Sequence, residues 1–90
     1  MDYTNAEIKT VKPKNLEDAQ TVANCLRNKI PVIVNFEETA PEEVKRIMDF
    51  ISGSNYALDG KVEVISQSKK VYLFAPKNID VEPNAPKKSW

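Results

Sequence analysis

Residue types that carry most enzyme chemistry are scarce in this sequence of 90 residues. It contains no histidine, and Cys25 is its single cysteine. A lone thiol without a histidine to deprotonate it is a weak nucleophile, and disulfide frameworks or zinc sites of cysteine and histidine ligands cannot be built. We therefore predict no metal ion and no cofactor, and we interpret Cys25 as a small, partly buried helix residue.

The carboxylates are numerous, but their positions favour a structural role. Glu37 and Glu38 precede a predicted helix, and Glu42 and Glu43 lie in its first turn. Acidic side chains at a helix start are explained by capping and by the helix dipole. The two glycines, Gly53 and Gly60, match neither of the glycine motifs that bind phosphate. We therefore expect a protein that is not an enzyme.

Basic and aromatic residues near the end of the chain are the remaining candidates. The pair Lys69-Lys70 precedes a predicted strand in which Tyr72 and Phe74 lie on one face, an arrangement that could stack nucleic-acid bases. The 13 basic residues, however, are balanced by 13 acidic ones. A neutral domain is poorly suited to phosphate neutralisation, so we predict no nucleic-acid binding.

Two helices must position these residues. Asn15 is a typical N-cap residue, and the apolar residues after it recur at helical spacing, which predicts a first helix over residues 16–28. Thr39 and Glu42 form a Thr-x-x-Glu capping box, with proline in the first turn, and predict the start of a second helix. We expect this helix to end at Gly53, because glycine is favoured where helices terminate.

The other segments favour strands. The unbroken apolar run IPVIVNF is typical of a central strand that is buried on both faces. Asp59-Gly60 indicates a turn or bulge within a strand pattern that starts at Tyr56. The predicted strands are residues 8–11, 30–36, 56–65 and 71–76, with an edge strand at 78–83.

This order predicts an α+β fold: a two-layer α/β sandwich with a mixed sheet of about five strands and two helices on one face. Val71 and Leu73 point to one side of their strand and Tyr72 and Phe74 to the other, so one apolar sheet face is expected to stay uncovered. We therefore predict a partner-binding module that forms a homodimer. No apolar run approaches the roughly 20 residues of a membrane span, and no signal peptide opens the chain, which predicts a cytoplasmic protein.

Four short motifs occur in order along the chain: Asp-Ala-Gln at the first helix, Pro-Val-x-Val-Asn in the following strand, Asp-Phe-x-Ser-Gly with Tyr-Ala-Leu, and Pro-x-Asn-x-Asp-Val near the end. They lie within EDAQTVANCLRNKIPVIVNF, RIMDFISGSNYALDG and VYLFAPKNIDV. In this order and spacing they resemble the core domain of SepF, a bacterial and archaeal cell-division family. The resemblance divides the chain into a loose segment (1–7), a SepF-like core (8–81) and a disordered tail (82–90).

The resemblance implies an adaptor with no catalytic step that binds the C-terminal tail of FtsZ, the tubulin-like protein of the division ring. Such an adaptor helps to anchor and organise FtsZ filaments at the division septum, and it forms a dimer or higher polymers. The residues expected to bind FtsZ are Tyr72, Phe74, Val64, Lys69 and Lys70. Those expected to mediate self-association are Gly53, Phe50, Ile47 and Ile51.

The start of the chain departs from the family pattern. SepF proteins normally begin with an amphipathic helix that inserts into the membrane surface, whereas MDYTNAE is too short and polar to do so. We expect a cytoplasmic protein at the division site whose membrane attachment depends on such a helix, absent from this chain.

Two other classes share this order of elements. A small-molecule-sensing regulatory domain of the ACT-like or ferredoxin-like kind would carry a glycine-rich loop after the first strand, where this chain has Lys12-Pro13-Lys14-Asn15. An acylphosphatase-like enzyme needs an arginine in a loop near that strand, but Arg27 and Arg46 both lie in predicted helices. The ACT-like domain is the alternative that we keep.

Overall fold

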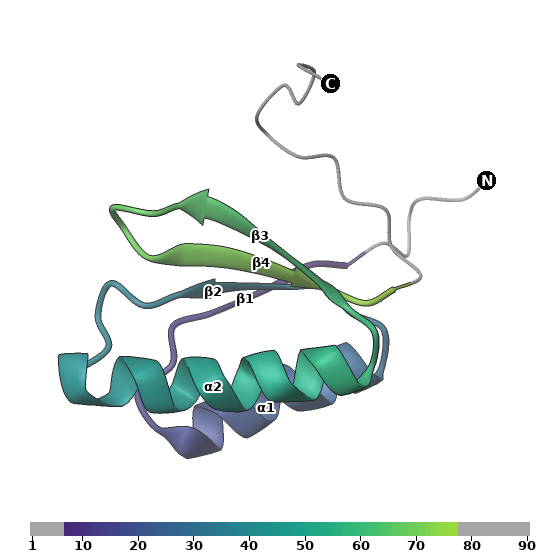
Figure 1. The fold of residues 1–90 in the computed structure, drawn as a ribbon, viewed down its shortest axis with the longest axis horizontal. Coiled ribbons are helices and arrows are strands. Elements are labelled where there is room, and N and C mark those ends of the chain that lie inside the picture. Colours follow the sequence, from purple (N-terminus) through teal and green to yellow (C-terminus); the bar gives the residue numbers. More distant parts are fainter. Residues whose placement is uncertain (1–6, 78–90) are drawn as a thin grey trace.

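The protein is a two-layer sandwich in which two helices cover one face of a sheet (Figure 1). The structure, a computed structural model, describes residues 7–77. In chain order the elements are β1 (Lys9–Val11), α1 (Leu16–Arg27), β2 (Val32–Asn35), α2 (Pro41–Ala57), β3 (Lys61–Ser66) and β4 (Val71–Ala75).

The sheet is mixed and runs in the order β1-β2-β4-β3. β1 and β2 are parallel and are connected through α1, whereas β4 lies antiparallel to both β2 and β3. The predicted sandwich with two helices on one face is confirmed. Within the described residues the sheet has four strands where about five were predicted, and the edge strand predicted at 78–83 lies outside them.

The start of α1 follows from local sequence, as predicted. The Asn15 side-chain oxygen accepts a hydrogen bond of 3.0 Å from the backbone N–H of Asp18. The Asp18 carboxylate in turn accepts one of 2.8 Å from the backbone N–H of Lys14. These reciprocal bonds satisfy two backbone donors at the helix start. The helix ends at Arg27, one residue before its predicted end.

The start of α2 corrects the predicted capping box. The N-cap residue is Ala40 rather than Thr39, and no side chain caps this helix. The buried Thr39 hydroxyl instead donates a hydrogen bond of 2.6 Å to the carbonyl oxygen of Pro13. This bond ties the loop before α2 to the loop before α1, so tertiary structure uses the hydroxyl that the local pattern assigned to the cap.

The end of α2 corrects a second prediction. The helix continues through Gly53 to Ala57, so Tyr56 belongs to its last turn and not to a strand. Gly53 is exposed, and a methyl group at its Cα would meet no atom within 4 Å. Glycine inside a helix costs only about 1 kcal/mol relative to alanine, which the burial of the helix's inner face outweighs.

The turn after α2 is built around Asn55, which is only 4% exposed. Its backbone carbonyl accepts a hydrogen bond of 2.8 Å from the N–H of Gly60, and its side-chain amide donates one of 3.1 Å to the carbonyl of Lys61. Asp59 adopts a left-handed backbone conformation with φ of 59°, and Gly60 does not. Gly60 is needed instead for close approach, because a methyl group there would overlap the Asn55 side chain.

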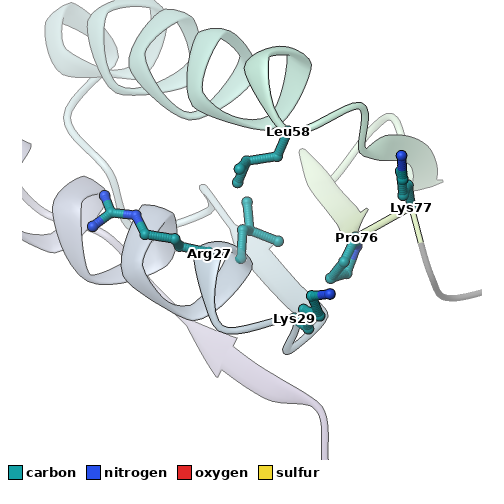
Figure 2. A pocket seen from close by; sticks show the side chains of 6 residues that line it. Arg27, Lys29, Leu58, Pro76 and Lys77 are labelled. Atoms are coloured by element: carbon teal, nitrogen blue, oxygen red, sulfur yellow. The ribbon is translucent and has the colours of Figure 1, made fainter.

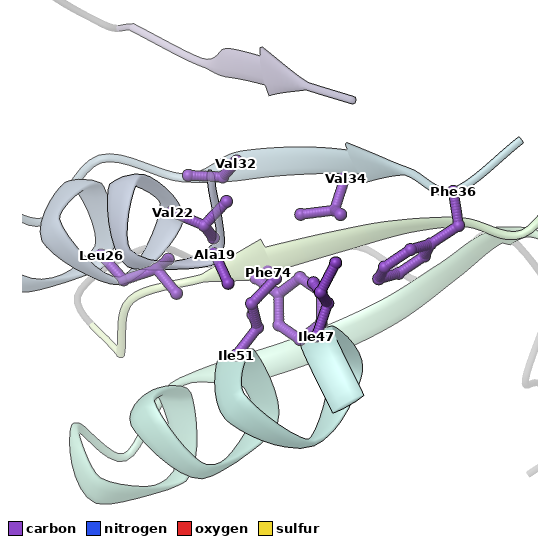
Figure 3. Close-up of a cluster of buried hydrophobic side chains, with 9 residues drawn as sticks. All are labelled: Ala19, Val22, Leu26, Val32, Val34, Phe36, Ile47, Ile51 and Phe74. Carbon is purple, nitrogen blue, oxygen red and sulfur yellow. The ribbon is translucent and has the colours of Figure 1, made fainter. Parts of the chain in front are cut away.

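The core lies between the sheet and the helices (Figure 3). β2 faces it with Val32 and Val34, which are fully buried, while Ile33 and Asn35 on its other face are half-buried. The prediction that this strand is buried on both faces is therefore wrong, because the second face has no covering layer among the described residues. The cluster consists of Ala19, Val22, Leu26, Val32, Val34, Phe36, Ile47, Ile51 and Phe74.

Candidate functional site

The helix-facing side of β3 is open. Val62 and Val64 lie opposite Phe74 and Tyr72 of β4 and share their side of the sheet. Phe74 is fully buried, yet Val62 and Val64 are 51% and 48% exposed. The two helices therefore cover this side of the sheet as far as β4 but leave the outermost strand uncovered. Exposed apolar residues side by side on one strand are typical of an interaction site.

A groove of about 300 Å³ lies between the last turns of α2 and β3. We call it the β3 groove. Tyr56 stands at its edge with 84% of its surface exposed, which is the largest exposed fraction among the exposed large apolar residues of the described chain. The residues that line the β3 groove are Ser52, Asn55, Tyr56, Gly60, Val62 and Phe74.

The β3 groove has no charged residue in its lining, so apolar contacts dominate what it can bind. The side-chain oxygen of Asn55 is buried and, among the described residues, has no hydrogen-bond partner. The pKa of Lys45 is raised by its hydrogen bond to Asp49, but this pair lies on the exposed side of α2, outside the groove. Residues 7–77 contain no cluster of side chains that could hold a metal ion.

The residues predicted to bind FtsZ occupy three different environments. Val64 is exposed on β3, and Lys69 and Lys70 are exposed in the hairpin loop between β3 and β4. Tyr72 is half-buried and contacts Phe36 edge to face, with ring centroids 5.9 Å apart. These residues do not converge on a single hollow.

Phe74 was expected to bind FtsZ, but the structure buries it. Alternation left open which side of β4 the helices cover; they cover the side of Tyr72 and Phe74, where Phe74 is 0% exposed and packs in the core. Its ring lines the inner side of the β3 groove. The opposite face of β4 carries Val71 and Leu73, which are half-buried.

The residues predicted to mediate self-association also separate into two groups. Gly53 is exposed on α2, and Phe50 is half-buried at the edge of the core. Ile47 and Ile51 are 0% exposed and belong to the core cluster. The latter two therefore hold α2 in place and present no surface to a second chain.

Two groove residues were missed from sequence. Val62 and Val64 alternate with charged residues in KVEV. This pattern indicated a strand with one apolar face but did not indicate that this face would lie open. Tyr56 was missed because the helix was expected to end three residues before it. The available signal was Tyr56 itself, which follows Gly53 by three residues, about one turn of a continuing helix.

No helix in the described part of the chain is long and apolar enough to cross a bilayer.

Comparisons with known proteins identify relatives along most of the chain. A family model described as "Cell division protein SepF" matches residues 8–81. The "Cell division protein SepF" of Desulfitobacterium hafniense is 42% identical over 81 residues, which cover 88% of this chain and 52% of that protein. The corresponding protein of Pelotomaculum thermopropionicum is 42% identical over 71 residues, which cover 79% of this chain and 46% of that protein. The chain thus spans about half the length of these curated relatives.

Two solved structures share the fold. A SepF-like protein from Pyrococcus furiosus aligns with a TM-score of 0.75 and 21% identity, covering 91% of this chain and all of that one. SepF from Methanobrevibacter smithii, solved in complex with FtsZ-CTD, aligns with a TM-score of 0.72 and 23% identity, covering 84% of this chain and 96% of that one. These two structures show the fold. The family model and the curated relatives favour the cell-division reading over the ACT-like alternative, and they show that the chain belongs to the SepF family of cell division proteins.

Proposed function

We propose that this chain is the FtsZ-binding core of a cell-division adaptor, and that the β3 groove takes part in binding the C-terminal tail of FtsZ. The M. smithii relative was solved with FtsZ-CTD, which supports the choice of partner. The observation that carries the proposal is the open, apolar helix-facing side of β3, where Val62 and Val64 are about half exposed.

The geometry suits a short peptide with apolar anchors. A groove of about 300 Å³ accommodates one large side chain, and short peptides commonly bind through a few such anchors. We assign the direct contacts to Tyr56, Val62 and Val64. Phe74 shapes the groove from inside the core, and Tyr72 borders Val64 across the strand pair. Lys69 and Lys70 extend the site toward the hairpin, where they offer positive charge to the peptide.

In this proposal the chain has no catalytic step. It acts in the cytoplasm at the division site, where it helps to anchor and organise FtsZ filaments. Attachment to the membrane surface is assigned to an amphipathic segment that residues 7–77 do not supply.

A titration with a fluorescent peptide of the FtsZ C-terminal tail tests the assignment. Saturable binding below about 100 μM is expected, a typical range for a short peptide in a groove. Val62→Thr and Tyr56→Ala should each weaken binding about tenfold, because they remove apolar contact from the groove. Both side chains are at least half exposed, so thermal unfolding should change little.

Ile8→Thr is the matched control, because Ile8 is 60% exposed and lies beside β1, at the edge of the sheet opposite β3. It should bind the peptide as tightly as the parent chain does. Absence of binding by the parent chain would remove the FtsZ assignment. Equal binding by Val62→Thr and the parent chain would place the tail elsewhere.

We further propose that the outer face of α2 near Gly53 mediates self-association, with the chain forming a homodimer and, through further contacts, polymers. Gly53 has no structural need to be glycine, since a methyl group there would meet nothing within 4 Å. An exposed glycine inside a helix allows another backbone to approach closely. Phe50, half-buried one turn earlier, supplies apolar surface beside it.

Substitution of Gly53 separates this role from a purely structural one. Gly53→Ala should raise the free energy of unfolding by about 0.5–1 kcal/mol, because alanine is the better helix former. Gly53→Lys should keep the fold and the monomer's circular dichroism spectrum but shift sedimentation toward smaller species. If sedimentation of Gly53→Lys matches that of the parent chain, the glycine does not lie in the interface.

A further inference from the structure

A second hollow lies where the end of α1, the turn between α2 and β3 and the end of β4 meet (Figure 2). Its volume is about 190 Å³. Leu26, Leu58 and Pro76 give it an apolar lining, and of these only Leu58 is appreciably exposed, at 37%. None of these residues lines the β3 groove.

Three basic residues complete the lining, two from the end of α1 and the turn after it and one from beyond β4. Arg27 ends α1, Lys29 follows it, and Lys77 lies beyond β4. Lys77 reaches the Asp59 carboxylate only at 4.0 Å, with both side chains at least 70% exposed, so this pair is weak. Within residues 7–77, Arg27 and Lys29 form no ion pair. The helix dipole accounts for a basic residue at Arg27, but Lys29 and Lys77 lie outside the helix.

Lys29 occupies a position that disfavours its side chain. It is the second residue after α1 and has φ of 66°, in the left-handed region. Its N–H bonds to the carbonyl of Leu26, as in the glycine-terminated helix ends where a side chain is unfavourable. Glycine would therefore fit this backbone better than lysine does. Lys29 therefore carries its charge at a structural cost, beside a hollow that is lined by two more basic side chains.

We propose that this hollow binds an acidic peptide segment of a partner protein, in which a carboxylate lies next to a branched aliphatic side chain. The aliphatic group would fill the apolar lining, and the carboxylate would interact with Lys29, while Arg27 and Lys77 on either side of the hollow add longer-range attraction (Figure 2). The volume suits one such side chain. No aromatic residue lines the hollow for base stacking, and the chain has no net charge, which disfavours nucleic acid. The inference does not depend on FtsZ.

Nitrogen-15 NMR titration of the full chain tests the proposal with the blocked peptide acetyl-Asp-Leu-Glu-amide. Fast-exchange shifts are expected at the amides of Lys29, Leu58 and Lys77, with a Kd of about 1 mM that weakens as salt is added. The isosteric peptide acetyl-Asn-Leu-Gln-amide should bind at least about tenfold more weakly, because its side chains carry no charge. Equal shifts from both peptides, shifts confined to other residues, or no shift up to about 10 mM would overturn the proposal.

Lys29→Gly provides the decisive variant because it cannot fail through misfolding of the left-handed turn. It should raise the unfolding temperature and lower the affinity for the acidic peptide at least about threefold. Lys14→Gln removes a lysine that is 64% exposed just before α1, at the helix end opposite this hollow, and should leave binding unchanged. Wild-type affinity in Lys29→Gly would show that the lysine is not part of a binding site.

Discussion

Replacing Gly60 with alanine is expected to lower the free energy of unfolding by about 3 kcal/mol, which is among the larger effects that adding one methyl group can have. The new Cβ would lie 2.6 Å from the Asn55 Cγ and 2.8 Å from the carbonyl oxygen of Ala75, and closer still to the Asn55 side-chain oxygen. Neither neighbour can move freely. Asn55 is held by its bond to the Lys61 carbonyl, and Ala75 belongs to β4.

Urea unfolding of Gly60→Ala and Gly53→Ala measures the contrast between the two glycines. The first substitution should destabilise and the second should stabilise, although both add the same methyl group. A double mutant of Gly60→Ala with Asn55→Ala isolates the clash. Its free energy of unfolding should be about 1 kcal/mol higher than the value obtained by adding the effects of the two single substitutions, since the side-chain overlap is removed. A change of less than about 0.5 kcal/mol in Gly60→Ala would contradict the close approach.

The two glycines also show which parts of the fold can be predicted from local sequence. Asn15 caps α1 as expected, because a cap depends on residues three positions apart. Gly53 predicted a helix end that does not occur, because a local preference of about 1 kcal/mol is outweighed by burial of the inner face of the same helix. The prediction that Thr39 caps α2 was wrong for a related reason, since its hydroxyl donates a hydrogen bond to the carbonyl of Pro13, 26 residues away.

The candidate site was less predictable than the fold. Whether Val62 is covered depends on which strand lies at the edge, and the order β1-β2-β4-β3 is set by connections between distant segments. Alternation in β4 showed correctly that Tyr72 and Phe74 share a side, but it could not show that the helices lie on that side. The uncovered apolar surface therefore has two parts: Ile33, Val71 and Leu73 are half-buried on the face opposite the helices, as expected, and Val62 and Val64 are exposed on the helix-facing side of β3, which alternation could not locate.

Truncation of Phe74 is expected to unfold the domain rather than only to remove a binding contact. Phe74 is 0% exposed, pairs with Val32 on one side and with Val62 on the other, and packs in the core cluster (Figure 3). Phe74→Ala should reduce the free energy of unfolding by about 3–5 kcal/mol, the usual cost of deleting a buried aromatic ring. For a domain of this size that is a large share of total stability.

The same substitution distinguishes two roles for Phe74 in the proposed binding of FtsZ. If its ring contacted the peptide from the surface, Phe74→Ala would abolish binding and leave thermal unfolding unchanged. Because the ring is buried, we expect binding to be lost only in parallel with folding, and Phe74→Leu, which keeps most of the core volume, should retain both. Val62→Thr should show the opposite pattern, with weaker binding and an unchanged unfolding temperature. Measuring peptide affinity and thermal unfolding on these three variants therefore separates the residue that shapes the groove from the residue that contacts its ligand.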